Sequence, residues 1–317
     1  MDNGYRSKNP SKLKPVVKIG PWLNAARLRT LPLSVSGVLV GTALANFYGT
    51  GDTLIFMLAL LTTIGFQITS NFANDYGDGI RGTDNEDRIG PKRALQSGIL
   101  SRKALKQGIW ISVLIDALLV ISLIYVAFGP QNLLFSVLFL ALGAASIWAA
   151  LKYTIGASAY GYKGLGDVFV FIFFGLVAVL GTLFLYTKFL TPMAFLPAIA
   201  IGLLSVGVLN LNNLRDYASD KKADKRTLVV YLGFEKAKVY HYLLVLSAFI
   251  CISAFLFLNF GDWRSYLPLL AFVPAFVHVF KVYKTNSPGL LDPELKKLAL
   301  SSFFLAVLMY VTCNNFL

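Results

Sequence analysis

This sequence has little charge and almost no cysteine or histidine. Only 14% of its 317 residues are charged and just 16 are acidic, whereas about a quarter of the residues of a soluble domain are charged. Its two cysteines, Cys251 and Cys313, lie inside apolar runs without the spacing of metal ligands, so we interpret them as small buried side chains. The scarcity of charge excludes an ordinary soluble domain.

The first residues also lack an apolar stretch followed by a cleavage site. Residues 1–15 are polar and basic. We therefore predict no removable signal peptide, and we expect the first helix to act as its own insertion signal.

What the chain does have is long apolar runs. Hydrophobic residues make up 56% of it, and the runs are near the length that crosses a bilayer as a helix. We predict an all-α polytopic membrane protein with nine transmembrane helices. These are expected at about 27–48, 53–76, 105–128, 131–151, 165–187, 193–214, 237–258, 264–283 and 297–315.

The distribution of Lys and Arg supports this topology. With nine spans, 27 of the 29 basic residues fall on one side of the membrane, and only Lys188 and Arg264 fall on the other. The positive-inside rule then places the N-terminus and the long loops in the cytoplasm and the C-terminus outside. The net charge of +13 is therefore mainly a topological signal and not a sign of nucleic-acid binding. We treat 1–317 as one domain, with a basic N-terminal segment at 1–20 and cytoplasmic active-site loops at 77–104 and 215–236.

Two acidic segments stand out at the ends of apolar runs. In the first, Asn74 and Asp78 are four residues apart and so project from one face of a helix. We expect the glycines of this segment to loosen the backbone, which would let Asp84 turn back toward Asp78. These glycines are Gly77, Gly79 and Gly82.

The second segment repeats the pattern 138 positions later. Asn212, Asp216 and Asp220 have a spacing of four twice and line one helical face. Carboxylate and amide oxygens suit magnesium, which keeps open positions for water and for a substrate phosphate. Two such segments at matching helix ends predict two magnesium ions that carry one diphosphate.

Basic residues surround both acidic segments. A diphosphate leaving group carries charge that two magnesium ions do not fully cancel, so fixed cations would hold it and stabilise the charge that grows as the carbon–oxygen bond breaks. The candidates in the first loop are Arg81, Arg88, Lys92 and Arg93. Those in the second loop are Arg215, Lys221, Lys222, Lys225 and Arg226.

Several segments match one known family. They are residues 27–32, 74–84, 87–94, 153–154, 164–167, 212–216 with Asp220, and 225–228. On these segments the chain resembles the UbiA superfamily of membrane-embedded prenyltransferases over essentially its whole length. The six-residue spacing between Asp78 and Asp84 is similar to that of the branch whose aromatic acceptor is 1,4-dihydroxy-2-naphthoate (the MenA type).

The resemblance implies a fold and a set of site residues. The fold is a UbiA-type bundle of nine helices around a central cavity. One magnesium ion would be held by Asn74, Asp78 and Asp84, and the other by Asn212, Asp216 and Asp220, and the four aspartates would be the catalytic residues. The contacts to diphosphate would be Arg88, Arg93, Arg215 and Lys225. Tyr153 would line the acceptor site.

The resemblance also implies a reaction and a place in the cell. A polyprenyl group would pass from polyprenyl diphosphate to 1,4-dihydroxy-2-naphthoate, with loss of carbon dioxide and diphosphate, to give demethylmenaquinone in menaquinone biosynthesis. Since an allylic cation in water is trapped as an alcohol, the site must be dry. The expected location is the bacterial cytoplasmic (inner) membrane, with the bilayer as a partner of the prenyl chain.

Three alternatives remain open from the residues alone. The first is a related prenyltransferase with another acceptor, such as 4-hydroxybenzoate. The second is an ion-coupled transporter, although its acids would lie at mid-bilayer and not at helix ends among basic residues. The third is a CDP-alcohol phosphotransferase, which needs one compact acidic stretch that this chain lacks.

Four ionisable residues lie within or next to the spans without a clear role. His241 and His278 have no partner at ligand spacing, and we interpret both as structural. Asp116, inside the third span, either packs against a polar neighbour or serves the site. Asp167 either caps the fifth span or faces the cavity.

Overall fold

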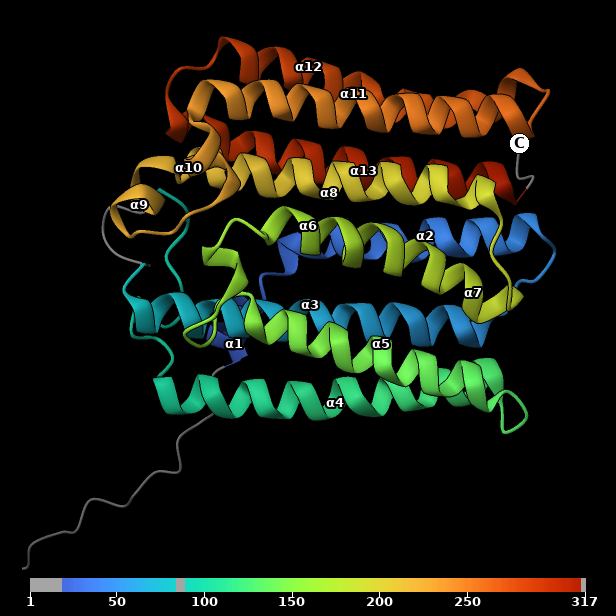
Figure 1. The fold of residues 1–317 in the computed structure, drawn as a ribbon, viewed down its shortest axis with the longest axis horizontal. Helices are drawn as coiled ribbons and strands as arrows, with labels where there is room; N and C mark the ends of the chain where they lie inside the picture. The colour runs from blue at the N-terminus through green and yellow to red at the C-terminus, as the bar shows by residue number, and fades with distance from the viewer. Residues whose placement is uncertain (1–18, 84–88, 315–317) are drawn as a thin grey trace, which may run out of the picture.

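The computed structural model describes residues 19–83 and 89–314. Within these residues every regular element is a helix, and nine helical segments are long and apolar enough to cross a membrane. The helices lie side by side along one common direction, with α4 at one edge of the bundle and α11 and α12 at the other (Figure 1). The predicted all-α fold and the nine spans are confirmed.

The helices follow the expected order along the chain. The first half contains α1 (Ile19–Ala26), η1 (Leu28–Thr30), α2 (Leu31–Phe47), α3 (Thr53–Arg81), α4 (Arg102–Phe128), α5 (Leu133–Lys152) and η2 (Tyr160–Tyr162). The fifth span joins α6 (Gly166–Val170), η3 (Phe171–Gly181) and α7 (Thr182–Thr187). The second half contains η4 (Pro192–Ala194), α8 (Phe195–Arg215), α9 (Tyr217–Lys222), α10 (Leu228–Leu232), α11 (Phe234–Asn259), η5 (Trp263–Ala271), α12 (Phe272–Lys284), η6 (Pro288–Leu291) and α13 (Asp292–Cys313).

Local signals fix both ends of α3, the helix that carries the first acidic segment. The Asp52 carboxylate accepts hydrogen bonds from the backbone N–H groups of Leu54 and Ile55, at 2.8 and 3.0 Å, and so caps the start. Gly82 ends the helix with φ of 71°, a conformation that costs glycine little. The 29 residues between these points carry Asn74 and Asp78 to one end of the bundle.

The outer faces of the bundle are strongly apolar. On α4, large hydrophobic side chains are exposed along the helix, and they are Trp110, Ile111, Leu114, Leu118, Ile121 and Tyr125. A soluble protein rarely exposes so continuous an apolar face, because water penalises it. This surface fits the acyl chains of a bilayer, so the chain is a multi-pass membrane protein.

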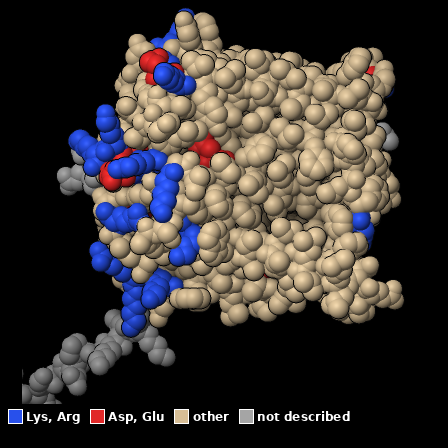
Figure 2. Space-filling view, viewed as in Figure 1, with Lys and Arg blue, Asp and Glu red and all other residues tan. Residues whose placement is uncertain are grey.

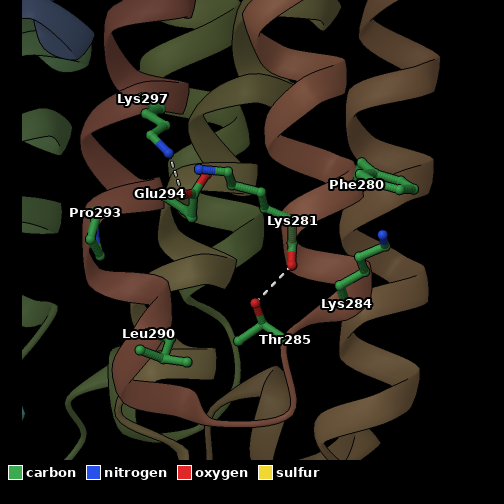
Figure 3. Close-up of a pocket in the computed structure, with 8 residues that line it drawn as sticks. All are labelled: Phe280, Lys281, Lys284, Thr285, Leu290, Pro293, Glu294 and Lys297. Carbon is green, nitrogen blue, oxygen red and sulfur yellow. Dashed lines mark hydrogen bonds and ion pairs between the residues drawn. The ribbon is translucent and has the colours of Figure 1, made fainter.

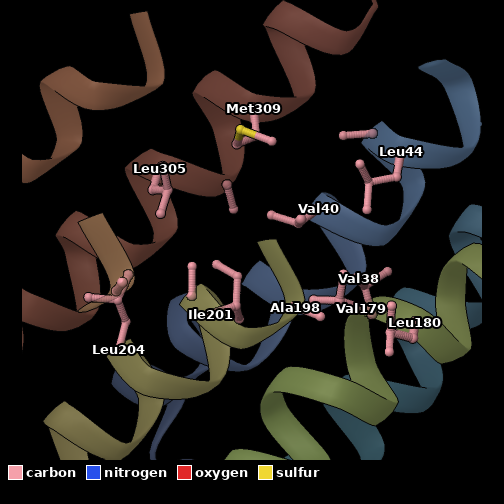
Figure 4. Close-up of a cluster of buried hydrophobic side chains, with 14 of the residues drawn as sticks. Val38, Val40, Leu44, Val179, Leu180, Ala198, Ile201, Leu204, Leu305 and Met309 are labelled. Carbon is pink, nitrogen blue, oxygen red and sulfur yellow. The ribbon is translucent and has the colours of Figure 1, made fainter. Parts of the chain in front are cut away.

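The main core joins the two halves of the chain. Figure 4 shows side chains of α2, η3, α8 and α13 packed together, among them Val40, Val179, Ile201 and Met309. Gly175 of η3 lies against Gly202 of α8, where a Cβ at position 175 would be 2.6 Å from the Gly202 Cα. Small residues at such crossings let helix backbones approach closely in a membrane.

Charge is concentrated at one end of the bundle. Figure 2 shows Lys and Arg gathered at the end where α3 finishes and α4 begins. Lys188, just after α7, and Arg264, in η5, lie at the opposite end of their spans. The charge separation predicted for the connections is thus present in the fold, while the side of the membrane that each end faces stays a prediction.

Candidate active site

The two acidic segments lie at the same, basic end of the bundle. Asp78 is on the last turn of α3, and Asp216 immediately follows α8. Both side chains are buried, with 5% of their surface exposed. Buried carboxylates need partners or a cation, because the loss of water destabilises the charged form.

The Asp78 carboxylate is held by a tyrosine. The Tyr162 hydroxyl, from η2, donates a hydrogen bond of 2.7 Å to Asp78 Oδ1 and lies 2.6 Å from Thr83 Oγ1. The Arg81 guanidinium carbon lies 4.1 Å from the centre of the Tyr162 ring, and Arg81 also donates to the Gly156 carbonyl. The segment after α5 therefore fixes the end of α3.

One turn earlier, α3 contacts the same segment through Asn74 and Gly77. Thr154 Oγ1 donates to the Ala73 carbonyl at 2.9 Å and lies 3.3 Å from Asn74 Oδ1. A Cβ at position 77 would be 2.5 Å from Thr154 Oγ1. Glycine is needed here because the two backbones come so close.

The expectation that the glycines loosen this segment is wrong for two of the three. The helix continues through Gly77 and Gly79 to Arg81, and only Gly82 leaves the helical conformation. Both helical glycines make room for neighbours, since a Cβ at position 79 would be 2.6 Å from the Leu95 side chain. Asp84 and Arg88 lie outside the described residues, so their predicted roles stay predictions.

The second acidic segment is organised by Arg215. Its Nε and Nη2 donate to the two carboxylate oxygens of Asp216, at 2.8 and 2.7 Å. Nη2 also donates to Asn212 Oδ1 at 2.9 Å, and Nη1 donates to Asp292 Oδ1 at 2.7 Å. Such a two-point pair fixes the carboxylate plane. Only 3% of Arg215 is exposed, so its donors serve protein acceptors here.

Lys225 joins the two segments. Its Nζ lies 3.6 Å from Asp220 Oδ1 and 5.5 Å from the centre of the Tyr162 ring, which itself holds Asp78. Burial alone would lower the pKa of Lys225, but the charges of Asp78 and Asp220, with Tyr162 and Asp216, outweigh it and raise the pKa. Lys225 is therefore a fixed cation among three carboxylates.

In Asp220, by contrast, the effect of burial on the pKa outweighs that of the neighbouring opposite charge. Burial raises the pKa of this carboxyl to about 6, against the lowering effect of Lys225, and the charges of Asp216 and Asp78 add to the rise. Its Oδ2 is buried without a hydrogen-bond partner. The charges of Asp78 and Asp216 thus bear on Asp220, while the predicted role of the three carboxylates as metal ligands stays a prediction.

These features fit a divalent cation. Clustered carboxylates that repel one another, one with a buried unpartnered oxygen, are relieved by such an ion, and oxygen ligands suit magnesium. Among residues 19–83 and 89–314, no group of three or more His, Cys, Asp or Glu side chains is already arranged as a metal site. The fit therefore rests on the donor chemistry of these carboxylates, with Asn74 and Asn212 beside them.

One of the predicted cations, Arg93, has different surroundings. Arg93 Nε lies 3.9 Å from Asp75 Oδ1, and Arg27 Nη2 lies 3.5 Å from the same oxygen. The other Asp75 oxygen accepts from the Ala94 backbone N–H at 3.1 Å. Asp75 thus ties the first segment of the chain and the loop before α4 to α3. Arg93 is thus connected to the site through Asp75, which lies next to Asn74 in the chain.

Tyr153 lies behind the carboxylates. It follows the last residue of α5, and its ring makes an edge contact with Tyr160 at 5.3 Å between centres. Burial raises the pKa of Tyr153, and the charges of Asp78, Asp167 and Asp220 raise it further, so the phenol stays neutral. Asp167 is buried in the first turn of α6, and both of its expected roles stay predictions.

Sequence reasoning missed several partners. Tyr162 donates to Asp78, and Asp292 accepts from Arg215, the residue that holds Asp216. Neither Tyr162 nor Asp292 belongs to an acidic segment. His241 and His278, which have no partner at ligand spacing in the sequence, form a buried pair with 2.8 Å between their Nε2 atoms, and His278 Nδ1 lies 2.9 Å from Glu294 Oε2. No spacing signal could reveal these pairs, since their members come from different helices.

The Asp116 side chain has a polar neighbour inside the membrane span. Thr69 Oγ1 donates to Asp116 Oδ2 at 2.6 Å, between α3 and α4. Asp116 has no exposed surface. This contact agrees with the first of its two expected roles.

Comparison with known proteins gives a consistent result. The model of the UbiA prenyltransferase family matches residues 34–309. A protein of Haemophilus influenzae named 1,4-dihydroxy-2-naphthoate octaprenyltransferase is 43% identical over 294 residues, which cover 92% of this chain and 94% of that protein. An Escherichia coli protein with the same name is 42% identical over 277 residues, 87% of this chain and 89% of its own length.

Solved structures show the same fold. A UbiA homolog from Archaeoglobus fulgidus, bound to DMAPP and Mg2+, superposes with a TM-score of 0.60 at 15% identity. The match covers 92% of this chain and 100% of that chain. The same homolog bound to GPP and Mg2+ gives a TM-score of 0.61 at 16% identity, over 93% of this chain and 99% of that chain.

Proposed function

This chain belongs to the UbiA prenyltransferase family, and we propose that it transfers a polyprenyl group from polyprenyl diphosphate to 1,4-dihydroxy-2-naphthoate. The products are demethylmenaquinol, which is the reduced form of demethylmenaquinone, carbon dioxide and diphosphate. The observation that carries the proposal is the convergence of the two acidic segments on Lys225, which contacts Asp220 directly and lies near the Tyr162 ring that holds Asp78. Relatives named for this activity align over nearly the whole chain.

The diphosphate of the donor is held at this convergence. Asn74, Asp78 and Asp84 form one set of magnesium ligands, and Asn212, Asp216 and Asp220 form the other. When bound, magnesium neutralises the diphosphate and makes it a better leaving group. The neighbouring cations proposed to contact it are Arg88, Arg93, Arg215 and Lys225.

Lys225 has a specific part in this step. Its raised pKa keeps the ammonium protonated, so it can donate hydrogen bonds to the diphosphate as the carbon–oxygen bond breaks. Arg215 acts differently, because Asp216, Asn212 and Asp292 occupy its donors. We assign Arg215 to the orientation of Asp216 and its amide neighbour, with diphosphate contact as a second role.

The acceptor ring attacks the prenyl C1 while water is kept away. The electron-rich ring of the dihydroxynaphthoate forms the new carbon–carbon bond at its carboxyl-bearing carbon, and that carboxylate leaves as carbon dioxide. Tyr153, neutral and half-buried against Tyr160, lines the acceptor side in this proposal. The apolar faces of the helices take the prenyl chain, which continues into the bilayer.

The location follows from the fold and the relatives. The chain is a multi-pass membrane protein, and its bacterial relatives point to the inner membrane. We further propose that the basic end, with the active site, faces the cytoplasm, following the positive-inside rule. Residues 1–317 form one prenyltransferase domain in this proposal.

The direct test is a product analysis. Membranes that contain the protein are incubated with magnesium, octaprenyl diphosphate and either 1,4-dihydroxy-2-naphthoate or 4-hydroxybenzoate, and the lipid products are identified by mass. The proposal predicts a prenylated naphthoquinol that has lost the mass of carbon dioxide. If only 4-hydroxybenzoate gave a product, it would be the acceptor in place of 1,4-dihydroxy-2-naphthoate. If neither aromatic acid gave a prenylated product, the proposed activity would be refuted.

A further inference from the structure

A second basic site lies away from the carboxylates, between α12 and α13. It is a hollow of about 530 Å³ where α12 ends and α13 begins, and Figure 3 shows the side chains around it. Its lining residues are Phe280, Lys281, Lys284, Thr285, Leu290, Pro293, Glu294 and Lys297. None of them has a place in the proposed prenyl transfer.

The charges of this hollow are unbalanced. Three lysines line it, against the single carboxylate of Glu294. That carboxylate is 4% exposed and is shared between Lys297 Nζ, 2.5 Å from Oε1, and His278 Nδ1, 2.9 Å from Oε2. One lysine is therefore matched within the protein, and Lys281 and Lys284 leave a net positive charge.

The buried histidine pair keeps the carboxylate in place. His241 and His278 are fully buried, and their contact runs from α11 through α12 to Glu294 on α13. Glu294 is thus fixed at the back of the hollow, and Lys297 covers it. An anion that enters meets ammonium groups and not the carboxylate.

The rim of the hollow is apolar and open to the surroundings. Phe280 is 57% exposed and Leu290 is 68% exposed. The outward face of α12 continues this surface toward the middle of the bundle with Val273, Phe276 and Val277. The hollow therefore lies where the exposed apolar surface of α12 reaches the basic end of the bundle.

We propose that this hollow binds an anionic phospholipid. Lys281 and Lys284 contact the headgroup phosphate, and Lys297 stays paired with Glu294. The Thr285 hydroxyl donates to the Lys281 carbonyl at 2.7 Å and so belongs to the wall of the hollow. The acyl chains lie along the exposed apolar face of α12, past Phe280. A basic pocket next to a lipid-facing surface selects for negative headgroups, because each lysine near the membrane surface contributes on the order of 1 kcal/mol of attraction to anionic lipid.

The test uses the full chain, purified in detergent and stripped of lipid. Native mass spectrometry counts the phosphatidylglycerol or phosphatidylcholine molecules retained as each lipid is titrated. The variant is Lys281→Gln with Lys284→Gln. Its matched control is Lys236→Gln with Lys296→Gln, which removes the same charge from exposed lysines at the same end that do not line the hollow.

The expected results separate the proposal from general charge attraction. Wild type and control retain phosphatidylglycerol in preference to phosphatidylcholine, and the Lys281/Lys284 variant binds it about 30-fold more weakly, as the loss of two lysine contacts implies. Equal weakening in both double variants, or equal binding of the two lipids by wild type, would overturn the proposal. So would full displacement of phosphatidylglycerol by inorganic phosphate at equal concentration, which would assign the hollow to a free anion.

Discussion

Asp78 and Asp216 differ in what holds their carboxylates. Asp78 accepts a hydrogen bond from the neutral hydroxyl of Tyr162, whereas both carboxylate oxygens of Asp216 accept hydrogen bonds from Arg215. A neutral donor leaves the carboxylate able to take a cation, while a guanidinium competes with one for the same oxygens. At the scale of single residues, the Asp78 carboxylate is therefore better able than that of Asp216 to bind a cation.

Asp78→Asn tests the role of that carboxylate. The amide oxygen can still accept from Tyr162, so the fold is preserved while the charge is lost. Prenyl transfer is expected to fall by about 10²–10³-fold, the range typical of a lost electrostatic group. An assay with labelled prenyl diphosphate measures it. Asp224→Asn is the control, since Asp224 is exposed in the second loop, where it pairs with the exposed Arg226, and it should retain activity.

Tyr162→Phe tests the positioning of Asp78. The change removes the hydroxyl that binds Asp78 and keeps the ring beneath Arg81. A hydrogen bond to a charged group contributes about 1.5–3 kcal/mol, so the magnesium concentration for half-maximal activity should rise roughly tenfold. Tyr231→Phe, at an 85% exposed position, should behave as wild type. An unchanged magnesium response in Tyr162→Phe would contradict this role.

At the scale of elements, α3 matters through its length and its glycines. Its caps carry the helix past the apolar span, so that Asp78 stands on regular helix and not on a loop. Gly77 lets the segment after α5 touch this last part of the helix. The loop that holds Tyr162 is thereby set against the carboxylate.

Gly77→Ala should disturb this contact. The added Cβ would lie 2.5 Å from Thr154 Oγ1 and 2.8 Å from the Thr154 carbonyl carbon, so backbone must move. Overpacking of this kind costs about 1–3 kcal/mol, which should lower the Tm in detergent by several degrees and reduce transfer. Gly20→Ala is a helical control with no atom within 4 Å of the new Cβ. If both variants melt like wild type, the close approach has no energetic importance.

At the scale of the whole molecule, the two halves meet at the site. α3 comes from the first half of the chain and α8 from the second. The charges of Asp78, on α3, and Asp216, after α8, both raise the pKa of Lys225. The shared core of α2, η3, α8 and α13 keeps the halves in register. Binding of a cation at this junction should therefore stabilise the complete bundle.

Magnesium should raise the Tm of the purified protein. A ligand at about 100 times its Kd stabilises the folded state by roughly 2.7 kcal/mol, which corresponds to a shift of several degrees. The shift should disappear after chelation with EDTA and be much smaller in Asp78→Asn than in Asp224→Asn. An equal shift in all three proteins would show that magnesium acts elsewhere.

The sequence by itself determined the nine spans, the gathering of basic residues at one end and the two acidic helix ends. These depend on run length, spacing of four and the cost of charge in lipid, all of which are local properties. The tertiary structure alone decided which side chains meet: Arg215 with Asp292, 77 residues apart, and His241 with His278, 37 residues apart. It also showed that Gly77, which the sequence predicted to be a flexible point, is instead in close contact with Thr154. Such pairings depend on how helices pack, and several packings satisfy the same apolar pattern, so no local spacing encodes them.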